Sequence, residues 1–192
     1  MMRLRAAAPT GWLPQAWLAL LVLAVSGFSF VFACAIPFAA FVVAATLTLA
    51  KRDALRVTVA LWLANQLIGY FILGYPRTLN SFTWGVAIGL AAVLSLLVAQ
   101  RIASNLRRGG ELARAAGAFV GAFAVYEVPL YVLAVAGLGG ASSFAVPIVG
   151  RIFAVNVIAL VVLLGVFRGA TVVVRYRRSA TAVTTPPQAI SS

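Results

Sequence analysis

The chain has 192 residues, of which 64% are hydrophobic and only 9% are charged. A soluble domain usually carries about 25% charged residues, so this chain lacks the polar surface that a water-soluble globule needs. Disordered chains are poor in hydrophobic residues, which excludes that class as well. The composition therefore predicts an integral membrane protein, and the length favours a single domain.

The inventory of reactive side chains is small. The chain has no His and a single Cys, Cys34, so histidine bases, histidine metal ligands and internal disulfides are excluded. Its only acids are Asp53, Glu111 and Glu127. Most acid–base and metal chemistry needs such groups. We therefore expect no enzyme, no catalytic residue, no metal and no cofactor.

The net charge of +12 would suggest a nucleic-acid partner in a soluble protein. Here the basic residues lie between long apolar runs. That arrangement is typical of membrane topology and of contact with anionic lipid. We expect a lipid bilayer and no nucleic acid as the partner of these charges.

Six apolar stretches predict an all-α bundle of six transmembrane helices, since a spanning helix needs roughly 20 apolar residues. Pro37 divides the first long stretch in two, because proline breaks or kinks a helix. Residues 1–16 are then a cytoplasmic N-terminal segment, residues 17–168 the transmembrane domain, and residues 169–192 a cytoplasmic tail that we expect to be largely disordered. The six predicted spans cover residues 17–34, 36–50, 57–73, 84–103, 113–137 and 148–167.

The basic residues predict the orientation of these helices. Cytoplasmic loops carry an excess of Lys and Arg. With six spans and both termini in the cytoplasm, all of the 15 basic residues except Arg77 and Arg151 lie inside. If residues 17–50 formed one span, Arg3 and Arg5 would also lie outside, so six spans fit better. The second span is short and would tilt or thin the bilayer.

A cleavable signal peptide is the alternative reading of the N-terminus. Arg3 and Arg5 precede an apolar run that reaches Ala33-Cys34-Ala35. The apolar run continues past that point, however, as it does in a membrane anchor. The sequence therefore favours an uncleaved first span.

Polar side chains within the third predicted span lie on one helical face. Trp62, Asn65, Gln66 and Tyr70 stand at positions i, i+3, i+4 and i+8, which share one face of a helix. Polar groups in hydrocarbon are costly and usually face the bundle interior. They either contact a ligand or form hydrogen bonds to neighbouring helices. Each such hydrogen bond stabilises the bundle by about 0.6 kcal/mol on average.

Glu127 is the only acid within a predicted span, and it lies between Tyr126 and Tyr131. A lone carboxylate in the membrane needs a partner or stays protonated. The functional hypothesis is a substrate ligand or a proton carrier. The alternative is a structural ion pair with Arg151 of the sixth span.

Arg151 and Asn156 are the polar residues of the sixth span. Arg151 either reaches the lipid headgroups or pairs with Glu127 or an anionic substrate. Because the third and fifth spans run outward and the sixth runs inward, all these groups gather from mid-membrane towards the outer face. The sequence therefore predicts a substrate pocket open to the outside, with these candidate residues: Trp62, Asn65, Gln66, Tyr70, Tyr126, Glu127, Tyr131, Arg151 and Asn156.

Three pairs of glycines have the GxxxG spacing that permits close packing of helices. We expect packing within the chain to be their first role and a partner surface the second. The pairs are Gly85/Gly89, Gly117/Gly121 and Gly165/Gly169.

In size, span count and polarity, residues 17–167 resemble the substrate-binding S components of energy-coupling-factor vitamin transporters. The stretches Leu63–Tyr70, Gly74-Tyr75-Pro76 and Phe82–Gly85 are similar to bacterial membrane proteins of that kind. The resemblance implies a six-helix bundle with an outward-facing site for a vitamin or its precursor. It also implies a transmembrane coupling subunit and two ATPases as partners. The small size of the chain and its Arg-rich, Ala-rich composition suggest a bacterial inner membrane. The AxxxA motif that such proteins often carry in the first helix is absent here.

Two other functions remain open. One is a stand-alone proton-coupled carrier of small solutes that uses Glu127, although no repeated halves are visible. The other is a non-catalytic assembly subunit. The chain has no G-x-x-x-x-G-K-[ST] loop, so any use of ATP needs separate subunits.

Overall fold

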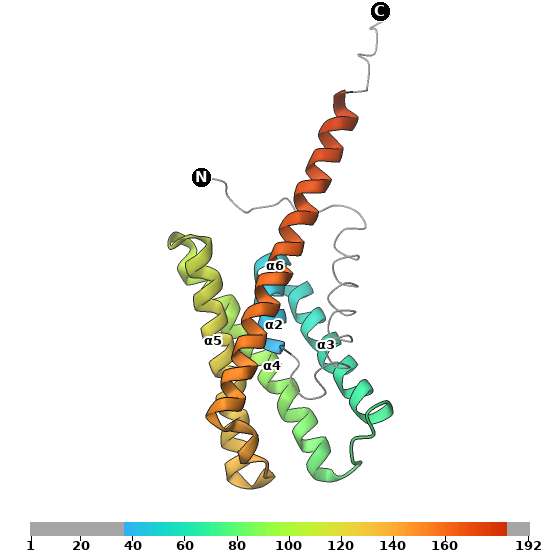
Figure 1. The fold of residues 1–192 in the computed structure, drawn as a ribbon, viewed down its shortest axis with the longest axis vertical. Coiled ribbons are helices and arrows are strands. Elements are labelled where there is room, and N and C mark those ends of the chain that lie inside the picture. Colours follow the sequence, from blue (N-terminus) through green and yellow to red (C-terminus); the bar gives the residue numbers. More distant parts are fainter. Residues whose placement is uncertain (1–36, 184–192) are drawn as a thin grey trace, which may run out of the picture.

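A computed structural model describes residues 37–183, with side chains through residue 173, and every regular element in that range is helical (Figure 1). The predicted N-terminal segment, the first span at 17–34, Cys34 and the final residues 184–192 lie outside the described residues. The major helices are α2 (Phe38–Thr48), α3 (Lys51–Phe71), α4 (Leu79–Asn105), α5 (Gly110–Leu133) and α6 (Val146–Val183).

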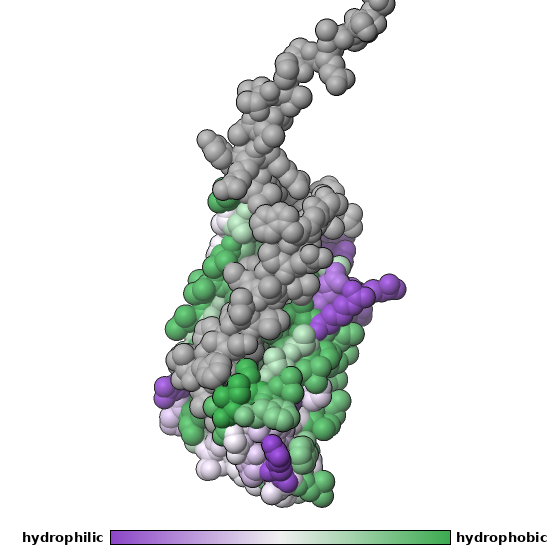
Figure 2. All heavy atoms as spheres, turned by 90° about the vertical axis from the view of Figure 1, so that its right-hand side faces the viewer, coloured by the Kyte–Doolittle hydropathy of each residue, from purple (hydrophilic) through white to green (hydrophobic). Residues whose placement is uncertain are grey.

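Among the described residues, three stretches are long and apolar enough to cross a membrane: Leu79–Arg108, Gly110–Leu138 and Val146–Val173. They contain the predicted spans at 84–103, 113–137 and 148–167, so the prediction of apolar membrane helices is confirmed there. Helix α3 is the most polar of the five. Charged residues occupy its first two turns and Asn65 and Gln66 its middle, and it does not belong to the three. Figure 2 shows that the described part of one face is largely apolar, broken by small hydrophilic groups.

Helix α2 is short and lies at the centre of the bundle. It has 11 residues, which at about 1.5 Å per residue covers only half of a hydrocarbon core. It contacts α3, α4, α5 and α6, and every residue from Phe38 to Ala45 is buried. A helix that is apolar on all sides is a buried helix. The predicted second span at 36–50 is thus a shorter helix enclosed by its neighbours.

The start of α2 is stabilised from another helix. The first amide groups of a helix have no acceptor within it, and Pro37, at the position before Phe38, has no side-chain oxygen to offer. The buried side chain of Asn156 on α6 fills this role. Its Oδ1 accepts from the Ala40 amide at 3.1 Å, and its Nδ2 donates to the Ile152 carbonyl at 2.9 Å.

Two of the three GxxxG pairs pack within the chain, as expected. A Cβ atom on Gly89 would lie 2.7 Å from the Trp62 ring of α3, and one on Gly121 would meet the Ile102 side chain of α4. Helices α4 and α5 are also joined by a bond from Ser95 Oγ to the Ala122 carbonyl at 3.0 Å. A Cβ on Gly165 would meet nothing within 4 Å in the described structure.

Consecutive helices run in opposite directions, so the connections gather at two ends (Figure 1). At one end, here called the basic end, α2 joins α3 and α4 joins α5. At the opposite end, α3 joins α4 and α5 joins α6, and the described basic side chains there are Arg77 and Arg151. The basic end holds Lys51, Arg52, Arg56, Arg101, Arg107, Arg108, Arg114 and Arg168.

Helix α6 extends past the basic end of the bundle (Figure 1). Arg168 forms an ion pair with Glu111 in the first turn of α5, with 2.8 Å between Nη2 and Oε2. The helix continues from there to Val183. The sequence predicted a largely disordered tail from residue 169, whereas helix α6 includes residues 169–183 in this structure.

Candidate functional site

The polar face of α3 packs along α4. The Trp62 Nε1–H donates to the Gly85 carbonyl at 2.8 Å, and the Tyr70 hydroxyl is bonded to Ser81 Oγ at 3.1 Å. The Gln66 amide oxygen lies against Gly85, 2.7 Å from where a Cβ would stand. A side chain at position 85 would crowd the Gln66 amide and touch the Tyr70 hydroxyl, so glycine at this position makes room for both. Three of the four predicted α3 site residues serve the α3–α4 contact.

Asn65, the fourth residue of this face, is partly buried. Within the described part of the chain its side chain forms no hydrogen bond, and it does not line either of the two hollows described below. The described structure therefore assigns its side chain no specific polar contact.

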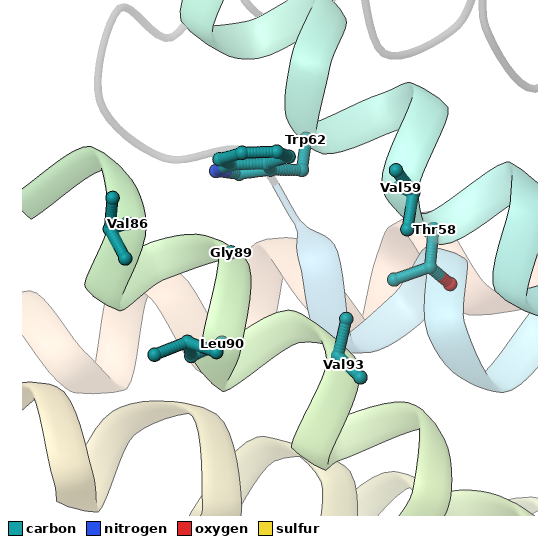
Figure 3. Close-up of a pocket in the computed structure, with 7 residues that line it drawn as sticks. All are labelled: Thr58, Val59, Trp62, Val86, Gly89, Leu90 and Val93. Atoms are coloured by element: carbon teal, nitrogen blue, oxygen red, sulfur yellow. The ribbon is translucent and has the colours of Figure 1, made fainter.

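A hollow of about 180 Å³ lies between α3 and α4 (Figure 3). Trp62 projects from α3 towards α4 at Gly89, and Thr58 and Val59 lie one turn before it. The remaining lining residues, Val86, Leu90 and Val93, are apolar, and the Thr58 hydroxyl donates to the Ala54 carbonyl of its own helix. This hollow thus offers an apolar surface and no free polar group for recognising a ligand.

Tyr126 belongs to the core rather than to a pocket. Its ring stacks on Phe38 at the start of α2, with 5.6 Å between centroids and 27° between planes. It packs against both clusters of buried apolar residues. The predicted ligand contact at this position is a structural contact in the described fold.

Glu127 and Tyr131 line a second hollow of about 230 Å³, near the end opposite the basic end. The other lining residues are Val128 of α5, Phe144 of the connection to α6, and Val149 of α6. The Tyr131 and Phe144 rings face each other at 5.6 Å and 58°. The Glu127 carboxylate is partly buried and takes part in no ion pair or hydrogen bond within the described residues.

The backbone between α5 and α6 holds Phe144 beside this hollow. Helix α5 continues through Pro129 and ends in a wide turn at Ala134–Leu138. Gly139 and Gly140 then adopt positive φ, a conformation that residues with a side chain rarely take. Asn80 of α4 fixes the turn, since its Nδ2 donates to the Leu138 carbonyl at 2.9 Å. A short helix, Ala141–Phe144, leads into α6.

Arg151 does not join Glu127. It is exposed and forms no ion pair within the described residues. It follows the hollow-lining Val149 by two positions, and at about 100° per residue this turns it to the far side of α6. The alternative in which Glu127 is neutralised by Arg151 is thus not realised in this structure.

Asn156 is 2% exposed and is fully occupied with the start of α2 and with its own helix. Sequence reasoning placed it among the ligand contacts, whereas here it is a structural residue. Conversely, that reasoning missed Phe144, Val149 and Asn80. The Gly139-Gly140 pair signals a turn, but nothing in the sequence reveals which helix that turn folds against.

The predicted site residues therefore fall into separate groups. Trp62 lines the apolar α3–α4 hollow, whereas Glu127 and Tyr131 line the second one. The described residues include no group of His, Cys, Asp or Glu side chains that would hold a metal ion. Of these two hollows, the second combines aromatic walls with a charged side chain that has no partner among the described residues.

The chain was compared with protein-family models, with curated proteins and with solved structures, and none of them matches.

Proposed function

We propose that this protein is a membrane-embedded subunit that binds a small molecule for uptake, with its site at the hollow beside Glu127. The observation that carries the proposal is a carboxylate without a partner among the described residues, on a helix able to span a membrane, beside a hollow with aromatic walls. Ionisable residues within membrane helices mark functional sites by default, because an isolated charge is costly there.

The proposed topology has six spans and both termini in a bacterial cytoplasm. In its support, the described basic side chains concentrate at one end of the bundle, as the excess of Lys and Arg on the cytoplasmic side requires. The hollow beside Glu127 then lies towards the outer face. Energy for release inward would come from separate ATPase subunits through a transmembrane coupling subunit, which the basic end is placed to contact.

A native mass measurement on the full chain, purified in mild detergent with its partners, tests this proposal. We expect a bound small molecule on the natural chain, lost in Glu127→Gln and retained in Glu111→Gln. The second variant removes a carboxylate from the same helix at the basic end, so it controls for the change in charge. Equal occupancy in both variants, or a natural chain free of any small molecule, would count against the site.

A proton-coupled carrier is the second candidate, and the same unpaired carboxylate favours it. The two candidates differ in their partners and in their energy source. Co-purified ATPase subunits favour the uptake subunit. Uptake by the chain alone in liposomes, abolished by a protonophore, favours the carrier.

A further inference from the structure

We infer that the ligand of the Glu127 hollow carries a positive charge, as a protonated amine or a quaternary ammonium group. This inference rests on the proposed function and adds the chemical class of the ligand. It is carried by the charge balance of the hollow, the aromatic side chains around it and its size.

The charge balance comes first. Glu127 is the single Asp, Glu, Lys or Arg among the residues that line the hollow. A partly buried carboxyl group is ionised when a nearby cation or several hydrogen-bond donors stabilise the charge, and otherwise it stays protonated. Within the described residues it has neither. A cationic ligand supplies the missing partner, and an anionic ligand meets a like charge.

Neither of the two described basic side chains at this end of the bundle forms an ion pair with Glu127. The Arg77 guanidinium carbon lies 5.9 Å from the centroid of the Phe71 ring. Arg151 is exposed and turned away from Val149, as described above. The other basic residues in the described part belong to the basic end. No protein cation in that part competes with a ligand for Glu127.

The aromatic walls favour the same class of ligand. Tyr131 and Phe144 come from separate elements and meet at a tilt, with 5.6 Å between their centroids. A cation over the face of an aromatic ring is attracted by the ring quadrupole when it lies within about 6 Å of the centroid. A carboxylate flanked by two rings therefore recognises an organic cation in two ways. The carboxylate attracts the positive charge, and the rings contact the apolar surface of the cation.

The size of the hollow sets the extent of the recognised group. At about 230 Å³ it lies just below the range of roughly 300–1,000 Å³ that holds whole drug-sized ligands. It therefore fits the charged end of a small molecule, such as an ammonium group with one ring.

Three probes of one shape and different charge test the inference: para-fluorobenzylamine, para-fluorobenzyl alcohol and para-fluorobenzoate. Binding to the full chain in lipid nanodiscs is followed by fluorine NMR at neutral pH, with empty nanodiscs subtracted. We expect the amine to bind about tenfold or more tightly than the other two. Glu127→Gln should weaken amine binding by about 10- to 100-fold, the loss expected for a hydrogen bond to a charged group.

Two further variants separate charge from shape. Phe144→Leu keeps an apolar wall and removes a ring, and should weaken the amine more than the alcohol. Glu111→Gln, which breaks the distant pair with Arg168, should leave all three affinities unchanged. Phe144→Leu also keeps the inference testable if Glu127→Gln fails to fold.

Two results would overturn the inference. One is binding of the alcohol or the benzoate as tightly as the amine, and the other is saturable amine binding that Glu127→Gln and Phe144→Leu both leave intact. Absence of amine binding would overturn it as well. In each case the proposed uptake function still stands if the native mass measurement finds a Glu127-dependent ligand, and it falls with the inference if no ligand is found.

Discussion

Replacing Asn156 by leucine is expected to destabilise the protein more than any other single change of a polar residue in the described bundle. The side chain is 2% exposed and satisfies the Ala40 amide at the start of α2. Leucine has the same branched shape and the same number of side-chain heavy atoms as asparagine, so the change removes the acceptor without opening a cavity. The Ala40 amide then stays buried without a partner, which costs about 1–3 kcal/mol. Unfolding midpoints in detergent, followed by circular dichroism, measure the loss.

Asn65→Leu is the matched control for this prediction. It makes the same chemical change in α3, at a partly buried position whose side chain forms no hydrogen bond in the described part of the chain. We expect its effect to stay within about 0.5 kcal/mol, as for substitutions that break no specific contact. Equal midpoints for the two variants would show that Asn156 does not support α2.

Gly89→Val is expected to force α3 and α4 apart. A Cβ at this position would lie 2.7 Å from the Trp62 ring, and the indole is anchored by its bond to the Gly85 carbonyl. Because the ring is rigid and tied to α4 itself, it cannot move aside without breaking that bond. Overpacking of this kind costs about 1–3 kcal/mol. The shift in tryptophan fluorescence and the unfolding midpoint both report the change.

Gly165→Val provides the comparison for overpacking. It has the same GxxxG spacing in α6, yet a Cβ there meets nothing within 4 Å in the described structure. Its unfolding midpoint should stay close to that of the natural chain. If Gly89→Val and Gly165→Val had equal unfolding midpoints, the close approach of α3 and α4 at Gly89 would be wrong.

The helices themselves were predictable from the sequence because a membrane helix requires a long run of apolar residues. The predicted spans at 84–103, 113–137 and 148–167 lie within helices of the structure, and Pro37 marks the start of α2 as expected. The break was visible because proline cannot donate a backbone hydrogen bond. The length of α2 was not predictable, because the apolar run in the sequence is longer than the helix that the neighbouring helices enclose.

The roles of single polar residues were harder to predict. Asn65 and Asn156 look alike in the sequence, as amides in apolar helices, yet Asn156 caps another helix 116 residues away. Such a role depends on which helix end lies opposite, and this is a property of the packing. The same holds for Phe144, which a glycine-rich turn brings to Glu127. Glu127 itself was predictable, because a carboxylate in an apolar run is rare enough to stand out.

Thiol labelling of intact cells tests the central claim, that the hollow beside Glu127 opens away from the cytoplasm. Two variants with a single cysteine each are compared, after the natural Cys34 has been replaced by serine. Val149→Cys places the cysteine in the hollow, and Leu112→Cys places it at an exposed site at the basic end. We expect a membrane-impermeant maleimide to label Val149→Cys in intact cells and Leu112→Cys only after lysis. Labelling of Leu112→Cys in intact cells, with Val149→Cys protected until lysis, would contradict it.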